Sequence, residues 1–276
     1  GKSGLEYGKE KRIPITWGIV TDLAAEKYGL SYAELVDYIG VAGGEIASHS
    51  CKHAAMASTN EYVSELVNSK AIIEQNVPGY VCRTFLQPGT WTGSAWLNLF
   101  SKLDNPIGQA LQATYAQSMA YLSSAWRVGN TYYRYGITNT INIDYQSYPT
   151  VGSVNAVLDV VAATPGLVFV ISCHGVQESG GTQTYHVRAN VLKALMDKLS
   201  QLRGENKIRL MGMDAAYHAV FSDSLNRFVD PGFELSKPLI GTFYYSPWTV
   251  GAGADIYPNN GFNNSCYGYL PPNGQL

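Results

Sequence analysis

The stretch Leu167-Val168-Phe169-Val170-Ile171-Ser172, which runs on into Cys173-His174-Gly175, is the strongest candidate for a buried β-strand in this sequence. Five consecutive apolar side chains, three of them β-branched, are typical of a strand that is covered on both faces. The strand would end immediately before His174, so an imidazole would stand at its C-terminal end. This stretch predicts a parallel, fully buried sheet.

Strand and helix patterns alternate along the rest of the chain. Ser31 followed by Glu34 has the spacing of a capping box and places a helix start there. The expected strands are 13–20, 43–48, 80–85, 138–144 and 207–211, and the expected helices are 31–39, 59–75, 151–163, 187–202 and 214–222, with 94–130 mostly helical around a break at 104–106. This alternation predicts an α/β fold with a mostly parallel sheet or barrel, in which functional residues gather at the C-terminal ends of the strands.

Composition narrows the function classes. The chain has 276 residues, is 46% hydrophobic and only 14% charged, and has a net charge of -2, which argues against a nucleic-acid surface. Twenty tyrosines and five tryptophans among so few charges suit an extracellular or carbohydrate-facing surface. No apolar run is long enough to span a membrane. The four cysteines lack Cys-x-x-Cys spacing, which disfavours a zinc knuckle or redox motif and leaves a disulfide open.

The residue composition changes from Val229 onward. Gly, Asn and Pro become frequent, and the pattern is one of short strands and turns. The segment is too short for a β-sandwich with its own core. We therefore expect two parts, an α/β domain over 1–228 and the beginning of a β-rich, possible carbohydrate-binding module over 229–276.

His49-Ser50-Cys51-Lys52-His53 follows one of the short expected strands and contains two of the five histidines. Neutral imidazoles are common ligands of zinc-like ions. Four residues apart on one helical turn, they would project from one face and could share an ion. The alternative is a pair of partly exposed surface histidines.

Other polar residues fall at further strand ends. Asp144-Tyr145 ends the strand 138–144, Arg83 falls in the strand 80–85, and His174 is well placed to present a general acid to a pocket. Each has a structural alternative: a satisfied core histidine for His174, a helix-capping or loop carboxylate for Asp144, and an ion-pair partner for Arg83.

In order and spacing, these elements resemble the polysaccharide deacetylase family, the NodB-homology enzymes of carbohydrate esterase family 4. The resemblance covers about residues 10–220, and the His-Ser-x-x-His match is its most specific part. It implies a distorted (β/α) barrel of the deacetylase type and a hydrolase that removes acetyl groups from a polysaccharide, from nitrogen or oxygen. On this resemblance, His49 and His53 are metal ligands, His174 is the catalytic acid, and Asp144 supports that acid.

The resemblance also implies a lining for the sugar pocket. The family's Asp-Trp element is similar to Asp144-Tyr145, which makes Tyr145 a substrate-binding residue. Its Arg-x-Pro-x-Gly loop is loosely matched from Arg83 to Pro88-Gly89, with Arg83 as the residue that orients the base and Pro88 and Trp91 beside the substrate. Trp91 and Tyr145 could equally pack in the core.

One element of the family is missing from the expected position. Its first motif, a strand ending in Asp-Asp, supplies the general base and a metal ligand, and it should lie about twenty residues before the strand 13–20. The barrel would thus lack its first strand in this chain, and Asp22 is the nearby carboxylate that could substitute. The resemblance implies a divalent metal, Zn or else Co or Ni, and a segment of a longer polypeptide in a secreted, cell-surface or virion tail protein.

Two rival functions stay open at this point. The first is a non-catalytic glycan-binding module on the deacetylase scaffold. The second is some other metal hydrolase on an α/β barrel, which would release no acetate from acetylated glycans.

Overall fold

The computed structural model describes residues 2–23, 30–89, 105–119, 140–164, 169–221, 255–257 and 267–269. The chain divides into two compact units, Gly1–Tyr217 and His218–Leu276. In the second unit, β9 (Asp255–Tyr257) and β10 (Tyr267–Tyr269) pair antiparallel. The expected boundary at 228/229 lies outside the described residues.

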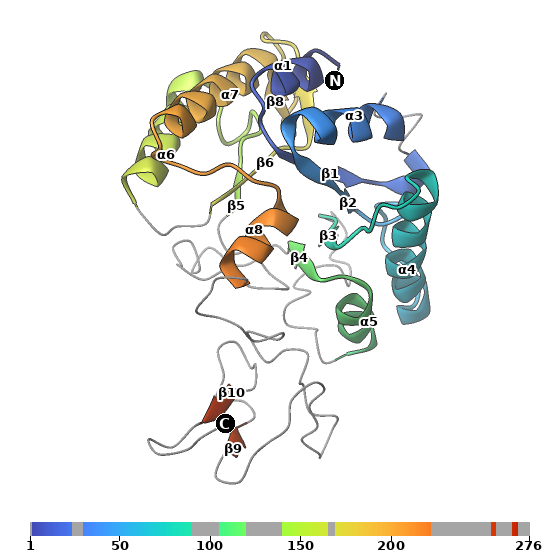
Figure 1. Ribbon diagram of the computed structural model, residues 1–276. Helices are drawn as coiled ribbons and strands as arrows, with labels where there is room; N and C mark the ends of the chain where they lie inside the picture. Colours follow the sequence, from blue (N-terminus) through green and yellow to red (C-terminus); the bar gives the residue numbers. More distant parts are fainter. Residues whose placement is uncertain are drawn as a thin grey trace. The chain divides into compact units, whose positions relative to one another are not determined.

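Parallel strands form the centre of the first unit. The strands β1 (Ile15–Ile19), β2 (Gly44–Ser48), β3 (Thr84–Leu86) and β4 (Gln117–Met119) lie in one parallel sheet in that order (Figure 1). Two further parallel pairs are β5 (Thr140–Asn142) with β6 (Val170–Ser172) and β7 (Gly175–Gln177) with β8 (His186–Arg188). The predicted α/β class with parallel strands is confirmed, whereas closure into a barrel is not seen among the described strands and stays a prediction.

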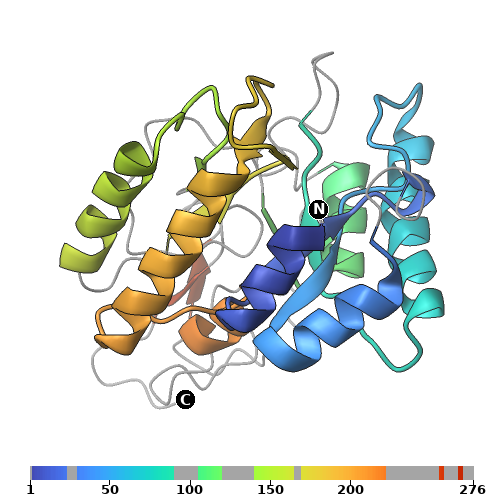
Figure 2. The same ribbon diagram turned by 90° about the horizontal axis from the view of Figure 1, so that it is seen from above.

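Helices cover the outer side of these strands. The unit contains α1 (Lys2–Glu10), a 3₁₀ turn η1 (Thr21–Leu23), α3 (Tyr32–Ala42), α4 (Thr59–Asn76), α5 (Pro106–Thr114), α6 (Val151–Ala163), α7 (Ala189–Gly204) and the start of α8 (Met213–Phe221). Seen from above, α6, α7, α1 and α3 follow one another along one side, and α4 and α5 pack together beyond them (Figure 2).

Local signals explain several helix starts. The capping box of Ser31 and Glu34 is present at the start of α3. The break at 104–106 is a helix start, in which the Asn105 side chain accepts two backbone N–H groups and Pro106 takes the first helical position. Both signals are local in sequence, which is why the sequence could predict them.

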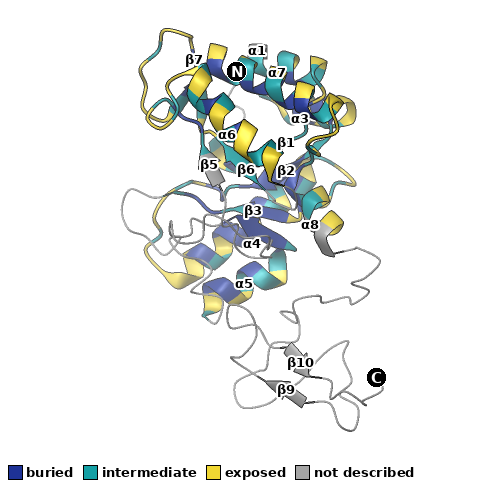
Figure 3. Ribbon diagram, turned by 90° about the vertical axis from the view of Figure 1, so that its left-hand side faces the viewer, coloured by how far each residue is buried: buried dark blue, intermediate teal, exposed yellow. Residues whose placement is uncertain are grey.

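Burial is concentrated in β2, β3 and β4 and on the inner sides of the helices (Figure 3). The expectation of a fully buried strand before His174 is wrong, because all three residues of β6 are only half-buried. One cluster joins β2, α4 and β3 through Ile46, Leu66 and Phe85, all fully buried. A second joins α6 and α7 through Leu158 and Val191. The strand ends that carry the polar residues are therefore held by packed cores on both sides.

Three expectations about local structure were wrong, and one helix was not expected. The strand β4 lies inside the stretch 94–130, which was expected to be mostly helical. Residues 207–211 form no strand; the segment leads into α8, whose first backbone N–H groups are bonded to Thr16 Oγ1 and Glu45. The strand 80–85 shortens to β3 because Tyr80 Oη contacts both the N–H and the C=O of Ile46, in place of strand pairing. The helix α1 was not expected, and it is stabilised by packing of Leu5 with Tyr38 of α3.

Candidate metal and acid–base site

The His49–His53 segment is a loop, so the predicted helical turn is wrong. It follows β2 directly, and Ser50 and His53 have left-handed backbones with φ of 66° and 53°. The loop nevertheless brings the two imidazoles together, with ring centroids 4.8 Å apart and ring planes at 62°. Because non-glycine residues rarely adopt positive φ, two such residues in five mark a strained segment of the kind found at functional sites.

A backbone carbonyl fixes the imidazole of His49. Its Nδ1 lies 2.8 Å from the carbonyl oxygen of Leu86 at the end of β3. Since a carbonyl can only accept, Nδ1 carries the proton and Nε2 keeps a lone pair. Burial, aided by the nearby His53 and His174, lowers the pKa of His49 to about 4, although the Leu86 carbonyl opposes the shift. This neutral ring with one oriented nitrogen is what a metal ligand requires.

A buried carboxylate on α4 holds the loop. Glu65 Oε2 accepts the backbone N–H groups of Cys51, at 2.8 Å, and Lys52, at 2.9 Å. Within the loop, the N–H of His53 donates to Ser50 Oγ at 2.9 Å. The hydrogen bonds that the strained loop cannot make to a helix or strand are thus supplied by side chains.

His174 and Asp144 form a hydrogen-bonded pair. Asp144 is buried, and its two oxygens contact His174 Nδ1 at 2.6 Å and the backbone N–H of His174 at 3.1 Å. The hydrogen bond that His174 donates to Asp144 raises the pKa of His174, even though partial burial opposes it. Since Nδ1 is engaged by Asp144, Nε2 is the nitrogen that remains to exchange a proton with a substrate.

The two pairs belong to one region of the molecule. His49 and His174 each stand just beyond the C-terminal end of a strand, β2 and β6 respectively. The charge of His174 also contributes to the lowered pKa of His49. The structure shows contacts within each pair, His49 with His53 and His174 with Asp144, and both pairs lie beyond the C-terminal ends of parallel strands.

Two predicted residues do not join this group. Asp22 lies in η1 next to the loop and donates its backbone N–H to the carbonyl of Cys51. Yet nowhere in the described part of the chain do three His, Cys, Asp or Glu side chains gather closely enough to hold a metal. Arg83 precedes β3, at the opposite end of that strand from Leu86, and its Nη1 lies 3.6 Å from Asp214 Oδ2.

The three residues expected to bind substrate, Tyr145, Pro88 and Trp91, differ in their surroundings. The half-buried ring of Tyr145 is covered by the guanidinium of Arg188, 4.1 Å from the ring centroid. Pro88 is buried just beyond the end of β3. Trp91 lies outside the described residues.

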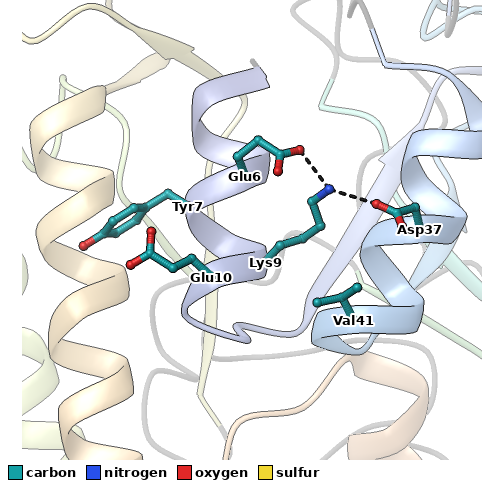
Figure 4. A pocket seen from close by; sticks show the side chains of 6 residues that line it. All are labelled: Glu6, Tyr7, Lys9, Glu10, Asp37 and Val41. Atoms are coloured by element: carbon teal, nitrogen blue, oxygen red, sulfur yellow. Dashed lines mark hydrogen bonds and ion pairs between the residues drawn. The ribbon is translucent and has the colours of Figure 1, made fainter.

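Two hollows in the described structure lie apart from the paired histidines. The larger, about 770 Å³, lies between α1 and α3 (Figure 4) and is crossed by ion pairs from Lys9 to Glu6 and Asp37, each 2.8 Å long. The smaller, about 350 Å³, adjoins Glu45 and Arg83 at the N-terminal ends of the strands. The first is bridged by exposed ion pairs that link two helices, and neither contains His49, His53, Asp144 or His174.

Sequence reasoning missed residues that position the site. Glu65 shares the buried face of α4 with Tyr62, Leu66 and Ser69, and a charged residue at helical spacing on an apolar face could have signalled a buried partner. Leu86 contributes only its carbonyl, which no side-chain pattern can reveal.

None of the helices in the described ranges is long and apolar enough to cross a bilayer.

Comparison with known proteins gives structural likenesses only. No family model matches the sequence, and no curated protein matches it. The structure is similar to that of a mutant of peptidoglycan deacetylase PdaC from Bacillus subtilis, with a TM-score of 0.48 and 14% identity over 79% of this chain and 83% of that one. It is also similar to a family 4 carbohydrate esterase from Bacillus anthracis, with a TM-score of 0.39 and 10% identity over 79% of this chain and 75% of that one. Neither likeness is strong enough to assign a family, a substrate or a mechanism.

Proposed function

We propose that this protein is a metal-dependent hydrolase that removes acetyl groups from a polysaccharide. The observation that carries the proposal is that two pairs of different character each stand just beyond the C-terminal end of a parallel strand, β2 and β6 respectively. One pair, His49 and His53, is suited to hold a metal, and the other, His174 with Asp144, is suited to hold a proton.

His49 and His53 would supply two nitrogen ligands, and their fit rests on the orientation of His49 by the Leu86 carbonyl. Two imidazoles suit Zn and also Co or Ni. A bound divalent ion would supply Lewis acidity to the acetyl carbonyl and to water. The third ligand and the general base are not among the side chains gathered around the pair, and Asp22 stays a prediction for that role.

His174 would donate a proton to the leaving sugar amine or alcohol from Nε2. Its bond to Asp144 holds the ring in one orientation and stabilises the protonated form, which is the form an acid needs before the reaction. Because the backbone N–H of His174 binds the same carboxylate, the ring and its backbone are positioned together.

The test is acetate release from acetylated glycans, measured with the protein first stripped of metal and then reloaded with Zn, Co or Ni. N-acetylated chitin oligosaccharides and O-acetylated xylan distinguish amide from ester substrates. We expect acetate only from the reloaded protein. Metal bound at a ratio of one per chain with no acetate from any of these glycans would overturn the proposal.

The second candidate is a glycan-binding module that does not catalyse. It is favoured by one observation, the lack of a third metal-ligating side chain beside His49 and His53 in the described ranges. This reading expects glycan binding without metal and without acetate. In either case we propose acetylated polysaccharide as the partner and a secreted, cell-surface or virion-surface setting.

A further inference from the structure

An exposed aromatic ring stands beside the proton donor. The ring centroids of Tyr185 and His174 are 6.1 Å apart, and the rings are nearly perpendicular at 73°. Tyr185 is 40% exposed, and it is the one aromatic among the large apolar residues that are prominently exposed in the described part of the chain. Its position next to His174 sets it apart from the five exposed valines, which are scattered over other elements.

Exposed rings on loops are usually mobile, but the turn that carries Tyr185 is held by a buried side chain. Gln177, at the end of β7, uses its amide nitrogen to donate to the carbonyls of Gln183, at 3.0 Å, and His186, at 2.8 Å. Its amide oxygen accepts the N–H of Gln183 at 2.8 Å. These three hydrogen bonds, from a side chain that is 9% exposed, close the loop between β7 and β8 on itself.

The same loop is tied to the neighbouring segment that contains Asp144. Backbone N–H groups of Tyr145 and Gln146 donate to the carbonyls of His186 and Thr184, which lie on either side of Tyr185. Arg188 Nε also donates to the carbonyl of Gly181 at 2.7 Å. The backbone on both sides of Tyr185 is therefore fixed relative to the His174–Asp144 pair.

We propose that Tyr185 is a stacking platform for a pyranose ring of the acetylated glycan and positions that ring beside His174. The aliphatic face of a sugar ring packs on an aromatic face, while the sugar hydroxyls stay in water. A fixed platform binds such a ring without the entropy cost of ordering a loop. Tyr145 cannot serve in the same way on the face that Arg188 covers. This inference rests on the proposed function, because it gives the glycan substrate its place beside the acid.

The test compares Tyr185→Phe, which keeps the ring, with Tyr185→Leu, which keeps apolar volume without a π-face. Binding of tetra-N-acetylchitotetraose and of acetylated xylotetraose is measured by isothermal titration calorimetry, with no catalysis required. We expect Tyr185→Phe to bind like the wild type and Tyr185→Leu to bind about tenfold more weakly, which corresponds to about 1.4 kcal/mol. The free energy of unfolding in urea should be the same in all three proteins, because an exposed ring contributes little to the packed core.

The outcomes separate this inference from the proposed function. Equal binding by the wild type and Tyr185→Leu, or no binding of either oligosaccharide by the wild type, overturns the platform. So does a loss of oligosaccharide binding in Tyr185→Leu that comes with a large loss of unfolding free energy, because that indicates general damage to the fold. Oligosaccharide binding that depends on the ring at position 185, in a protein that never releases acetate, supports the platform and overturns the hydrolase instead.

Discussion

Replacement of Glu65 by alanine should loosen the loop that carries the paired histidines. The Glu65 carboxylate is 5% exposed, and one of its oxygens accepts two backbone N–H groups from that loop. No other side chain of α4 is seen to accept from these two N–H groups in the described structure. The variant therefore tests whether a helix outside the site sets the geometry of the metal ligands.

The expected magnitude follows from these contacts. A hydrogen bond to a charged group contributes about 1.5–3 kcal/mol, and a buried N–H left without an acceptor costs about 1–3 kcal/mol. Cys51 is buried whereas Lys52 is exposed, so only the first N–H loses all access to water. We therefore expect Glu65→Ala to lower the free energy of unfolding by about 2–4 kcal/mol, and Glu65→Gln, which keeps one acceptor oxygen, by about 1 kcal/mol.

The assay pairs urea unfolding with titration of Zn into metal-free protein. The matched control is Ile73→Ala, a fully buried position two turns further along α4, where removal of a large aliphatic side chain costs about 2–5 kcal/mol. Both variants should lose stability, but only Glu65→Ala should also lose Zn affinity, by at least tenfold, with Glu65→Gln between it and the wild type. Equal Zn affinity in Glu65→Ala and Ile73→Ala would refute the reasoning, as would wild-type stability in Glu65→Ala.

Three further outcomes are expected. Asp144→Asn should lower the pKa of His174. Because the protonated ring is the proposed acid, the decline of activity with rising pH should then begin at a lower pH than in the wild type. An unshifted alkaline limb in the pH–rate profile would contradict this role. Gly44→Ala should cost about 2 kcal/mol or more of unfolding free energy, measured in urea, because φ is 105° and a Cβ would collide with the backbone of β1. His49→Ala and His53→Ala should each abolish metal binding in a Zn titration, whereas His174→Ala should bind Zn normally and lose about 10²–10⁴-fold in turnover; loss of Zn binding in His174→Ala would count against separate roles.

The sequence predicts most of this fold where the signal is local. The strand that ends before His174, the strand that ends before His49 and the capping box at Ser31 all depend on residues within a few positions of one another. The helix α1 escaped prediction because it contains Gly4 and Gly8, which disfavour an isolated helix, and is stabilised by contacts with α3 and α7 that are distant in sequence.

The candidate site was also predicted where the signal is local and missed where the contact is distant in sequence. Residue types at strand ends identified both histidine pairs, but the sequence could not give the backbone that joins His49 to His53. A spacing of four is compatible with a helical turn, whereas the observed loop has left-handed conformations at Ser50 and His53. The loop is held by Glu65, twelve positions beyond it, and its first imidazole is held by the carbonyl of Leu86, which has no side-chain signature. Such long-range backbone contacts are what local patterns omit.

The buried acidic side chains of the described residues have one role in common, which is to accept backbone N–H groups. Three acidic side chains are buried in the described ranges, Glu45, Glu65 and Asp144, and each accepts at least one backbone N–H from a segment distant in sequence. Glu45 accepts the backbone N–H of Asp214 at the start of α8, near the N-terminal ends of the strands. Glu65 and Asp144 accept backbone N–H groups of the His49–His53 loop and of His174, beyond the C-terminal ends of the strands. Because an unpaired buried carboxylate is costly, each of these groups forces its segment into one position. Buried carboxylates therefore hold the start of α8 at one end of the strands and the two histidine segments at the other.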